Sequence, residues 1–327
     1  MTPKASVVCA LPLLMTSTAK GTTMPDLETR RLGRTELKPK AIGLGCAFLG
    51  SPQRVSDDDG IATVRNAIDR GLNFIDTSAA YGGGESERRV GLALQDGYRE
   101  KVYLQTKAGT HPDHRHDYSA KTIRWTVENS LRLLKTDYID SVLIHDPRDT
   151  DDPFASGCAQ EELLKMKSEG LIGHTGIGCR SHDFHRRAIE TGHCDLLITF
   201  LDYTLLSQTA AETTIPLALK NDVGLILASV QGMGLLAGPK PDPEFSERRY
   251  PGQADRAIAM WEWCNTRNIS IRRMALQYCL AAPLDGNGML LVGPATPSEL
   301  DEVLTDATAD VDRDLWDAFE QEFGVGI

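Results

Sequence analysis

The chain has 327 residues, enough for a single α/β barrel, because barrels of about 250 residues or more routinely form one domain. Its formal net charge of −11 and isoelectric point near 5.2 argue against nucleic-acid binding, which needs clustered Lys and Arg side chains opposite phosphate. Seven widely spaced cysteines without a Cys-x-x-Cys pair argue against a disulfide scaffold or a structural zinc site and favour a reducing, cytoplasmic location. No apolar run reaches the roughly 18 residues that a membrane span needs.

The first 23 residues differ in composition from the rest of the chain. Lys4 followed by the apolar segment 7–15 loosely resembles a signal peptide, but Pro12 interrupts that segment and the cysteine usage argues against secretion. We therefore expect residues 1–23 to be a disordered extension, or to precede the true start at Met24. Residues 24–327 would then form the folded domain.

Apolar, strand-like runs alternate with helical patterns through the rest of the chain. Acidic residues favour the start of a helix over 57–71, which Gly71 ends, and Ser119 is the expected cap of a helix over 119–136. Eight strands, each followed by a helix, are the pattern of a closed parallel (β/α)8 TIM barrel. The predicted strands are residues 41–45, 72–76, 101–106, 139–145, 172–177, 194–200, 223–228 and 288–292.

Two features add to this regular pattern. Residues 29–40 predict a short hairpin around Arg34-Thr35-Glu36, placed to cover the bottom of the barrel. Residues 253–268 and 312–324 predict two helices beyond the regular eight. The sequence has no linker and no short internal repeat, so it predicts one domain.

Three neighbouring strands of the predicted barrel end in a polar residue. Asp76, Lys107 and His145 close the apolar runs of strands two, three and four, and Tyr81 follows in the loop after Asp76. In a TIM barrel the active site forms at the carboxyl ends of the strands. Parallel neighbours would bring the three side chains onto one rim, with Tyr81 above them.

These residue types suit proton transfer between an alcohol and a carbonyl group. A free phenol titrates near pH 10, and the ammonium of Lys107 beside Tyr81 would lower that pKa while Asp76 kept Lys107 charged and oriented. His145 would donate a hydrogen bond to a carbonyl oxygen. The hydride must come from a cofactor, since no side chain supplies one. Each residue alone is more often a helix cap, a core group or a solvent-reaching lysine, but the combination favours a site.

Two segments resemble signatures of the aldo-keto reductase family. Gly71-Leu72-Asn73-Phe74-Ile75-Asp76-Thr77-Ser78-Ala79-Ala80-Tyr81-Gly82, with Ser86-Glu87 and Gly91, resembles the first signature, and residues 131–140 leading into His145 resemble the second. The resemblance covers roughly residues 29–310. It implies a (β/α)8 barrel that binds a nicotinamide dinucleotide without a Rossmann domain, and no G-x-G-x-x-G fingerprint opens a βαβ unit here. It also implies a catalytic tetrad with Tyr81 as general acid/base, made of Asp76, Tyr81, Lys107 and His145.

Within the family, His145-Asp146-Pro147 and residues 202–206 resemble the sugar 1-dehydrogenase branch. That branch includes L-galactose and L-fucose (D-threo-aldose) dehydrogenases, which oxidise a sugar hemiacetal to a lactone with NAD. We therefore expect an NAD(P)-dependent oxidoreductase that acts on an aldose. A general aldehyde or ketone reductase, a low-turnover cofactor-binding regulatory subunit and a metal-dependent barrel hydrolase are the alternatives.

The resemblance also implies which residues hold the cofactor, and several depart from the family pattern. Gly178-Cys179 replace the usual Ser-Asn that holds the nicotinamide amide, Phe200 replaces a Gln, and Ala228 replaces the stacking tyrosine. Amide recognition and stacking must then use other groups, such as backbone atoms or Phe200. The predicted cofactor set is Gly45, Cys46, Asp76, Gly178, Cys179, Phe200, Ser229, Gly232, Gly234, Leu235, Gly293, Thr296, Glu299 and Glu302.

Gly293 and Glu299 of the predicted cofactor set indicate a preference for NAD, with NADP as the alternative. NADP-preferring relatives typically carry Lys or Arg at the position of Gly293 and Arg at that of Glu299. Glu299 would repel a 2′-phosphate, whereas a carboxylate can accept hydrogen bonds from a free ribose 2′-hydroxyl. The competing interpretation is that Glu299 only starts an exposed helix.

Two loops carry further candidate features. His111, His114 and His116 cluster after Lys107, where we expect a solvated, substrate-facing loop rather than a metal site. Residues 233–252 predict a long irregular loop, which resembles the family's loop over the pyrophosphate and would close after cofactor binding. The expected partner is a small-molecule substrate, an aldose or another carbonyl compound, with no nucleic acid, membrane or metal.

Overall fold

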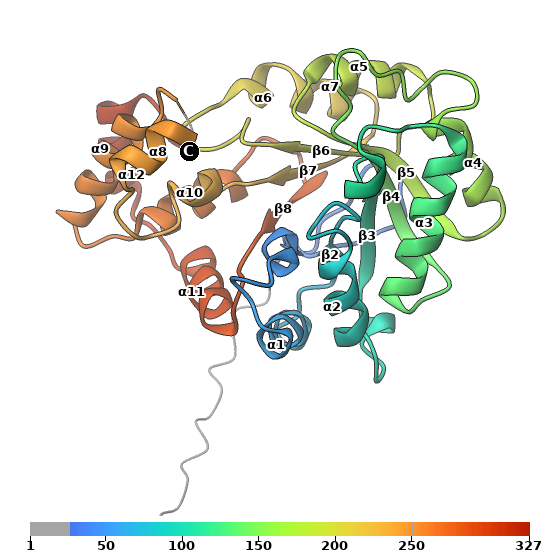
Figure 1. The fold of residues 1–327 in the computed structure, drawn as a ribbon. Coiled ribbons are helices and arrows are strands. Elements are labelled where there is room, and N and C mark those ends of the chain that lie inside the picture. The colour runs from blue at the N-terminus through green and yellow to red at the C-terminus, as the bar shows by residue number, and fades with distance from the viewer. Residues whose placement is uncertain (1–26, 250) are drawn as a thin grey trace, which may run out of the picture.

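The core of the molecule is a closed barrel of eight parallel strands that pair in chain order, with β8 returning to β1 (Figure 1). The structure, a computed structural model, describes residues 27–249 and 251–327, so the predicted extension 1–23 lies outside it. The barrel confirms the predicted fold, and each strand boundary lies within two residues of its prediction. The strands are β1 Ile42–Gly45, β2 Phe74–Asp76, β3 Tyr103–Ala108, β4 Ile139–His145, β5 Ile172–Gly178, β6 Leu196–Phe200, β7 Gly224–Ala228 and β8 Gly288–Val292.

Helices surround the barrel and bury its outer face (Figure 1). The two additional helices predicted over 253–268 and 312–324 are present as α9 and α12, and Trp263 of α9 packs against Phe319 of α12 with ring centroids 5.1 Å apart. None of the helices described here is long and apolar enough to cross a membrane. The helices are α1 Asp57–Asp69, α2 Glu85–Ala93, α3 Ala120–Leu134, α4 Ala159–Ser168, α5 His182–Glu190, α6 Thr209–Glu212, α7 Thr214–Lys220, α8 Pro243–Arg249, α9 Ala254–Asn265, α10 Ile271–Leu280, α11 Pro297–Thr308 and α12 Arg313–Phe323.

Of the helix starts indicated by the sequence, that of α1 has a side-chain cap and that of α3 does not. Ser56 caps α1 by accepting a hydrogen bond from the Asp59 amide, and the acidic first turn suits the positive end of the helix dipole. Ser119 precedes α3 as predicted, but its side chain makes no cap hydrogen bond. The prediction of an irregular stretch over 233–252 is wrong for α8, where Pro243 occupies the first helical position, a place that suits its fixed φ.

The segment 27–40 crosses the bottom of the barrel, as predicted, but is less regular than a hairpin. Thr29 and Lys40 form a single antiparallel bridge, and Arg31 donates its amide to Gly286 near the start of β8. Gly33 turns the chain with φ of +59° and lies so close to Gly224 that a Cβ would overlap that residue's backbone nitrogen. Arg30 donates its amide to Pro39 across the bridge, whereas Arg31 and Arg34 donate theirs to residues just before β8 and β7.

Alternation along the strands divides the barrel interior into an apolar lower part and a polar upper part. Since successive side chains point to opposite faces, Gln105 and Lys107 of β3 share the interior face, as do Ser141 and His145 of β4. Leu32 joins the apolar lower part, whose barrel side chains are Phe74, Leu143, Leu196, Ile198, Ile226, Met289 and Leu291. The polar side chains therefore collect at the carboxyl ends of the strands.

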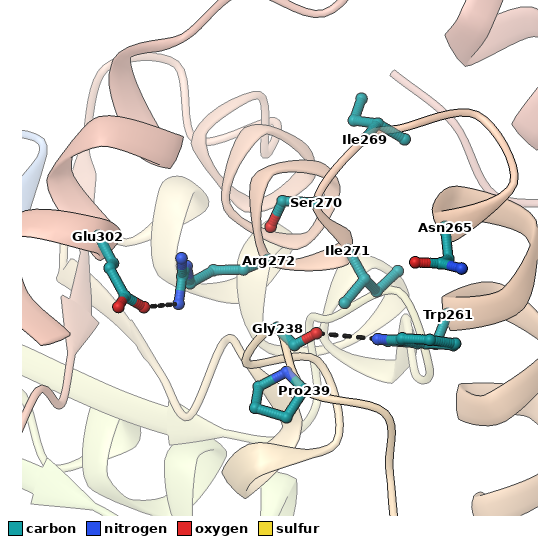
Figure 2. A pocket seen from close by; sticks show the side chains of 9 residues that line it. All are labelled: Gly238, Pro239, Trp261, Asn265, Ile269, Ser270, Ile271, Arg272 and Glu302. Carbon is teal, nitrogen blue, oxygen red and sulfur yellow. Dashed lines mark hydrogen bonds and ion pairs between the residues drawn. The ribbon is translucent and has the colours of Figure 1, made fainter.

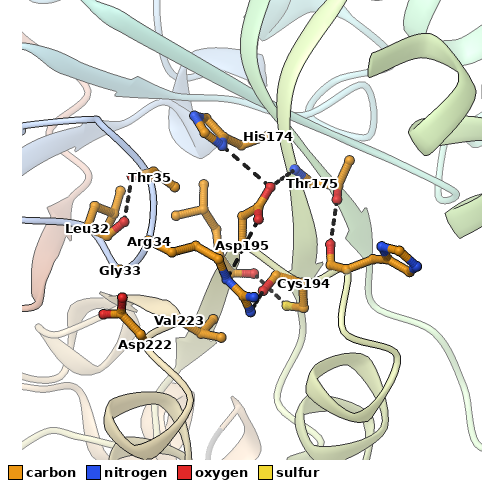
Figure 3. A network of polar contacts seen from close by, with 12 residues as sticks. Leu32, Gly33, Arg34, Thr35, His174, Thr175, Cys194, Asp195, Asp222 and Val223 are labelled. Carbon is orange, nitrogen blue, oxygen red and sulfur yellow. Dashed lines mark hydrogen bonds and ion pairs between the residues drawn. The ribbon is translucent and has the colours of Figure 1, made fainter. Parts of the chain in front are cut away.

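An acidic residue at the amino end of β6 holds the barrel bottom together (Figure 3). Asp195 lies 2.8 Å from Lys167 Nζ, 3.4 Å from His174 Nδ1 and 3.9 Å from Arg34 Nε. Burial acts to raise the pKa of Asp195, but hydrogen bonds from His174 and Lys167 outweigh it and lower the pKa to about 2. The carboxylate thus stabilises the fold only while it is ionised.

We expect Asp195→Asn to lower the free energy of unfolding by about 2 kcal/mol at neutral pH, given an unfolded-state pKa of about 3.9. The pKa of Asp195 is lower in the folded state than in the unfolded state. The stability that its carboxylate contributes is therefore fully present above about pH 4 and is lost as the pH falls towards about 2. Urea unfolding of both proteins at neutral pH and in acid would measure the difference. If the difference in unfolding free energy between the wild type and Asp195→Asn did not shrink in acid, the stabilising role of the ionised Asp195 would be contradicted.

Candidate active site

The four predicted catalytic side chains lie together at the carboxyl end of the barrel. Asp76, Lys107 and His145 stand at or near the ends of β2, β3 and β4, which are consecutive neighbours in the sheet. Tyr81 comes from the loop between β2 and α2 and places its ring at the mouth. Its ring centroid lies 5.9 Å from that of His145, edge to face.

A buried ion pair forms the base of the site. Lys107 Nζ lies 2.7 Å from Asp76 Oδ2, 2.8 Å from the backbone oxygen of Thr77 and 3.3 Å from Tyr81 Oη. The ammonium therefore has an acceptor for each of its three hydrogens. Burial opposes the charge on Lys107, but Asp76 and Tyr81 outweigh that cost, so the pKa of Lys107 lies above its ordinary value.

A second layer of polar side chains, which the sequence reasoning missed, orients the acid. Gln105 Nε2 donates to Asp76 Oδ1 over 2.8 Å, and Ser141 Oγ donates to Gln105 Oε1 over 2.9 Å. All three side chains are buried. The sequence could have indicated Gln105 through the two-residue period of a strand, because Gln105 lies two residues before Lys107 and therefore on the same strand face. This chain of bonds fixes the carboxylate that faces Lys107.

Close backbone packing positions Tyr81. Gly82, with φ of +65°, follows it and lies against Gly50 of the short 3₁₀ helix Ala47–Gly50 so tightly that a Cβ on either glycine would meet the other segment's backbone. Burial raises the pKa of the phenol above its ordinary value, and the opposing effect of Lys107 is smaller. Lys107 acts to lower the pKa of Tyr81, as predicted, but in the free protein burial outweighs that effect and the pKa is raised.

His145 is held as a neutral hydrogen-bond donor. Its Nδ1 lies 2.6 Å from the Thr110 hydroxyl and 3.1 Å from the Ser78 hydroxyl, and its backbone oxygen accepts a bond from Tyr118. Burial, with Lys107 and His116 nearby, holds the pKa of His145 well below its ordinary value. Because hydroxyl groups can donate to Nδ1, we assign the ring hydrogen to Nε2.

Three of the glycines that the sequence predicted as cofactor contacts lie at the carboxyl ends of strands. A Cβ on Gly178, at the end of β5, would lie 3.6 Å from Lys107 Cδ, in ordinary contact. Gly45 ends β1, and Gly293, which follows β8, lies next to it. A Cβ on any of the three glycines would make only ordinary van der Waals contacts, so crowding does not require glycine at these positions.

The two predicted cofactor cysteines point their thiols into the protein. The side chains of Cys46 and Cys179 are buried; burial raises the pKa of the Cys179 thiol to about 12, and burial also raises that of Cys46. A reactive thiolate is therefore not expected at either position. Contacts from these residues to a cofactor would come from their backbone atoms.

A tight loop after β7 carries four of the predicted cofactor residues. Phe200 and Ala228 pair across β6 and β7 directly before it. Ser229 has φ of 53°, and the run Gly232–Gly234 is left-handed throughout, with Leu235 next in the chain. The amides of Gly232 and Gly234 donate to the backbone oxygens of Ser229 and Gln231, so the loop is a compact turn held by its own hydrogen bonds.

The last predicted cofactor residues lie at the start of α11. Thr296 caps this helix by accepting from the Glu299 amide, while Glu299 Oε2 accepts from the Ala295 amide over 2.7 Å. Glu299 Oε1 lies 3.7 Å from Arg54 Nη2, a neighbour that the sequence reasoning did not identify. Both interpretations of Glu299 therefore have a structural basis, since it starts the helix and also presents a carboxylate there.

A cavity of about 370 Å³ lies beside this segment (Figure 2). Glu302 is on its wall and pairs with Arg272 over 2.8 Å, while Trp261 donates to the backbone oxygen of Gly238 from another wall. Arg272 also bonds to Asp306, so the guanidinium is held in place. The cavity adjoins α10, α11 and the loop after β7.

The histidine loop after β3 packs on an aromatic side chain. The rings of His111 and His114 lie 5.0 Å and 4.7 Å from that of Trp125, and His116 faces Asp151. Within residues 27–249 and 251–327, no group of three His, Cys, Asp or Glu side chains could hold a metal ion.

Comparison with known proteins agrees with the geometry. The sequence profile of the aldo/keto reductase family matches residues 41–321. The chain belongs to the aldo/keto reductase family. It is 30% identical to the D-threo-aldose 1-dehydrogenase of a Pseudomonas species over 84% of this chain and 92% of that protein. It is 33% identical to the L-galactose dehydrogenase of Arabidopsis thaliana over 85% of this chain and 88% of that protein.

Solved structures support the fold of this aldo/keto reductase. The holo form of aldo-keto reductase AKR11C1 from Bacillus halodurans superposes with a TM-score of 0.77 at 24% identity, covering 91% of this chain and 96% of the other. The glycerol dehydrogenase AKR11B4 from Gluconobacter oxydans gives 0.72 at 24% identity, covering 90% and 94%. By its family, the protein is an NAD(P)-dependent oxidoreductase that acts on a small-molecule carbonyl compound.

Proposed function

We propose that this aldo/keto reductase oxidises the hemiacetal carbon of an aldose to a lactone, with NAD as its preferred cofactor. The observation that carries this proposal is the assembled tetrad in a chain 30% and 33% identical to two sugar dehydrogenases, the D-threo-aldose 1-dehydrogenase and the L-galactose dehydrogenase. A bound nicotinamide would accept the hydride from the hemiacetal carbon, and the residues of this chain would move the proton.

Tyr81 is the proposed proton carrier. In oxidation its phenolate takes the proton of the hemiacetal hydroxyl while the carbon loses hydride, so that a carbonyl forms and both bonds to hydrogen are accounted for. Lys107 stabilises the phenolate at 3.3 Å, and Asp76 keeps Lys107 charged and in place. The neutral His145 donates from Nε2 to the reacting oxygen and so orients the substrate.

The residues that hold the cofactor in this proposal surround the mouth. The nicotinamide ring would lie against Gly178 at the end of β5, with Phe200 at the end of the neighbouring strand β6. The loop after β7, which carries Ser229 and the run Gly232–Gly234, would lie along the pyrophosphate. Glu299 would accept a hydrogen bond from the ribose 2′-hydroxyl.

An assay of nicotinamide absorbance over a panel of aldoses and simple aldehydes, run in both directions, tests the proposed reaction. Turnover of L-galactose or L-fucose with NAD is the expected result. Aldehyde reduction without any sugar oxidation would overturn the aldose assignment. Absence of turnover on the whole panel would favour a regulatory subunit instead.

We expect Glu299→Arg to raise the ratio of kcat/KM for NADP over NAD by about tenfold or more, since it replaces repulsion of the 2′-phosphate by attraction. The dissociation constants of both cofactors, measured by quenching of protein fluorescence, should move in the same direction. Asp301→Arg makes the same charge change two residues away and should leave the ratio nearly unchanged. A wild-type preference for NADP would contradict the proposal for Glu299.

A further inference from the structure

The residue after the catalytic histidine has an unusual backbone and an unused carboxylate. Asp146 follows β4 with φ of 41°, a left-handed conformation that costs most residues other than glycine about 1 kcal/mol or more. Its amide donates to the backbone oxygen of Gly178 over 2.9 Å, which ties it to the end of β5. The turn therefore fixes where the side chain of Asp146 starts.

The carboxylate of Asp146 lies beside the group proposed to hold the reacting oxygen. Its Oδ2 is 3.5 Å from His145 Nε2, and among the described residues no cation or hydrogen-bond donor lies closer to it. The side chain is 42% exposed, which leaves it accessible from the mouth. Burial raises the pKa of Asp146 to about 6 against the opposing effect of Lys107, and its charge in turn raises the pKa of Tyr81. Asp146 thus acts on the same space as Tyr81 and His145.

A carboxylate in this position has a specific chemical preference. When ionised it only accepts hydrogen bonds, so a ligand that displaces water from it must offer a donor in return. An oxygen bound between Tyr81 Oη and His145 Nε2 would place the next carbon of the substrate, and any hydroxyl on it, toward Asp146. A hydroxyl there satisfies the carboxylate, whereas a hydrogen atom leaves it desolvated without a partner.

We propose that Asp146 is a specificity residue that accepts a hydrogen bond from the hydroxyl on the carbon next to the reacting one. It would thereby select 2-hydroxylated substrates, such as aldoses and 2-hydroxyaldehydes, over simple aldehydes. The inference builds on the proposed function, because it places the substrate oxygen between Tyr81 and His145.

The alternative interpretation is that Asp146 has only a structural role, because aspartate suits a left-handed turn. Asparagine suits that conformation equally well, and glycine adopts it freely, so Asp146→Asn and Asp146→Gly both keep the backbone. The Asn variant removes the charge at nearly constant shape, and the Gly variant removes the side chain. Asp149→Asn is the matched control, because Asp149 is an exposed carboxylate of the same loop.

The experiment compares each substrate with its analogue that lacks the neighbouring hydroxyl. Kinetics of L-fucose oxidation are set against 2-deoxy-L-fucose, and reduction of glycolaldehyde against acetaldehyde, for the wild type and the three variants. For the hydroxylated member of each pair, we expect kcat/KM to fall about a hundredfold in Asp146→Gly and somewhat less in Asp146→Asn. For the deoxy member it should change less than about threefold, and Asp149→Asn should match the wild type for all substrates. The dissociation constant of NAD, measured by fluorescence quenching, should not move.

The outcomes separate this inference from the proposed function. Equal losses on both members of a pair would show that Asp146 acts through His145 or the fold, and unchanged kinetics would show a turn residue only; either result overturns the inference. If the wild type oxidises no aldose, the proposed function fails. The aldehyde pair still tests Asp146 in that case, because glycolaldehyde and acetaldehyde differ only by the neighbouring hydroxyl.

Discussion

Tyr81→Phe should lower kcat by a factor of at least about a hundred, in line with the loss of a positioned acid/base group. The phenol is the only hydroxyl within hydrogen-bond distance of Lys107 Nζ among the described residues, so no neighbour can take over its proton. The aromatic ring stays in the variant and continues to pack at the mouth. Steady-state kinetics with the best substrate of the panel, and cofactor titration by fluorescence, measure the two expected effects.

Cofactor binding separates a chemical role of Tyr81 from a structural one. The dissociation constant of NAD should stay within about threefold of the wild-type value, because the change removes one oxygen atom and leaves the ring. Tyr103→Phe is the control, since it removes a phenol oxygen from the opposite end of β3 and should keep full turnover. An unchanged kcat in Tyr81→Phe would refute the assignment of Tyr81 as the proton carrier.

Lys107→Met should abolish turnover and also destabilise the protein by about 3 kcal/mol, the usual cost of breaking a buried pair from one side. The variant leaves the Asp76 carboxylate buried, and the Gln105 amide is then its one donor among the described residues. It also removes the charge that opposes the raised pKa of Tyr81, so phenolate becomes harder to form. Urea or thermal unfolding and kinetics on the same preparation measure both losses.

A second substitution distinguishes these two losses. In Asp76→Asn/Lys107→Met the unpaired charge is gone, and we expect most of the lost stability to return while turnover stays absent. Lys107→Met as stable as the wild type would show that the pair carries no net coupling. Restored turnover in the double variant would show that Lys107 has no part in the chemistry.

Local sequence patterns were sufficient to predict the barrel and the position of the tetrad. Parallel strands place their carboxyl ends at one rim, and the two-residue period decides which side chains face inward. Asp76, Lys107 and His145 each lie at or near the carboxyl end of their own strand and face inward, and both properties can be predicted from that strand alone. The one further condition was that the three strands lie side by side, and the pairing of β2 with β3 and of β3 with β4 meets it.

Predictions that depended on neighbours from elsewhere in the chain fared less well. The hairpin over 29–40 shrinks to one bridge because Arg31 and Arg34 bond to backbone groups at the starts of other elements. The role of Gln105 became visible only when β2, β3 and β4 were in register. The proximity of Arg54 to Glu299 joins residues that are far apart in the sequence, and no local pattern encodes it.

The sequence by itself determined which groups the site contains, and the tertiary structure decided their protonation states. Tyr81 keeps a raised pKa and His145 remains neutral because burial, a property of the assembled barrel, outweighs or reinforces the charge of Lys107. The position of Asp146 beside His145 Nε2 likewise depends on a left-handed turn held by β5. Residue type and strand period are local, whereas desolvation and cross-strand distances exist only after the chain has folded.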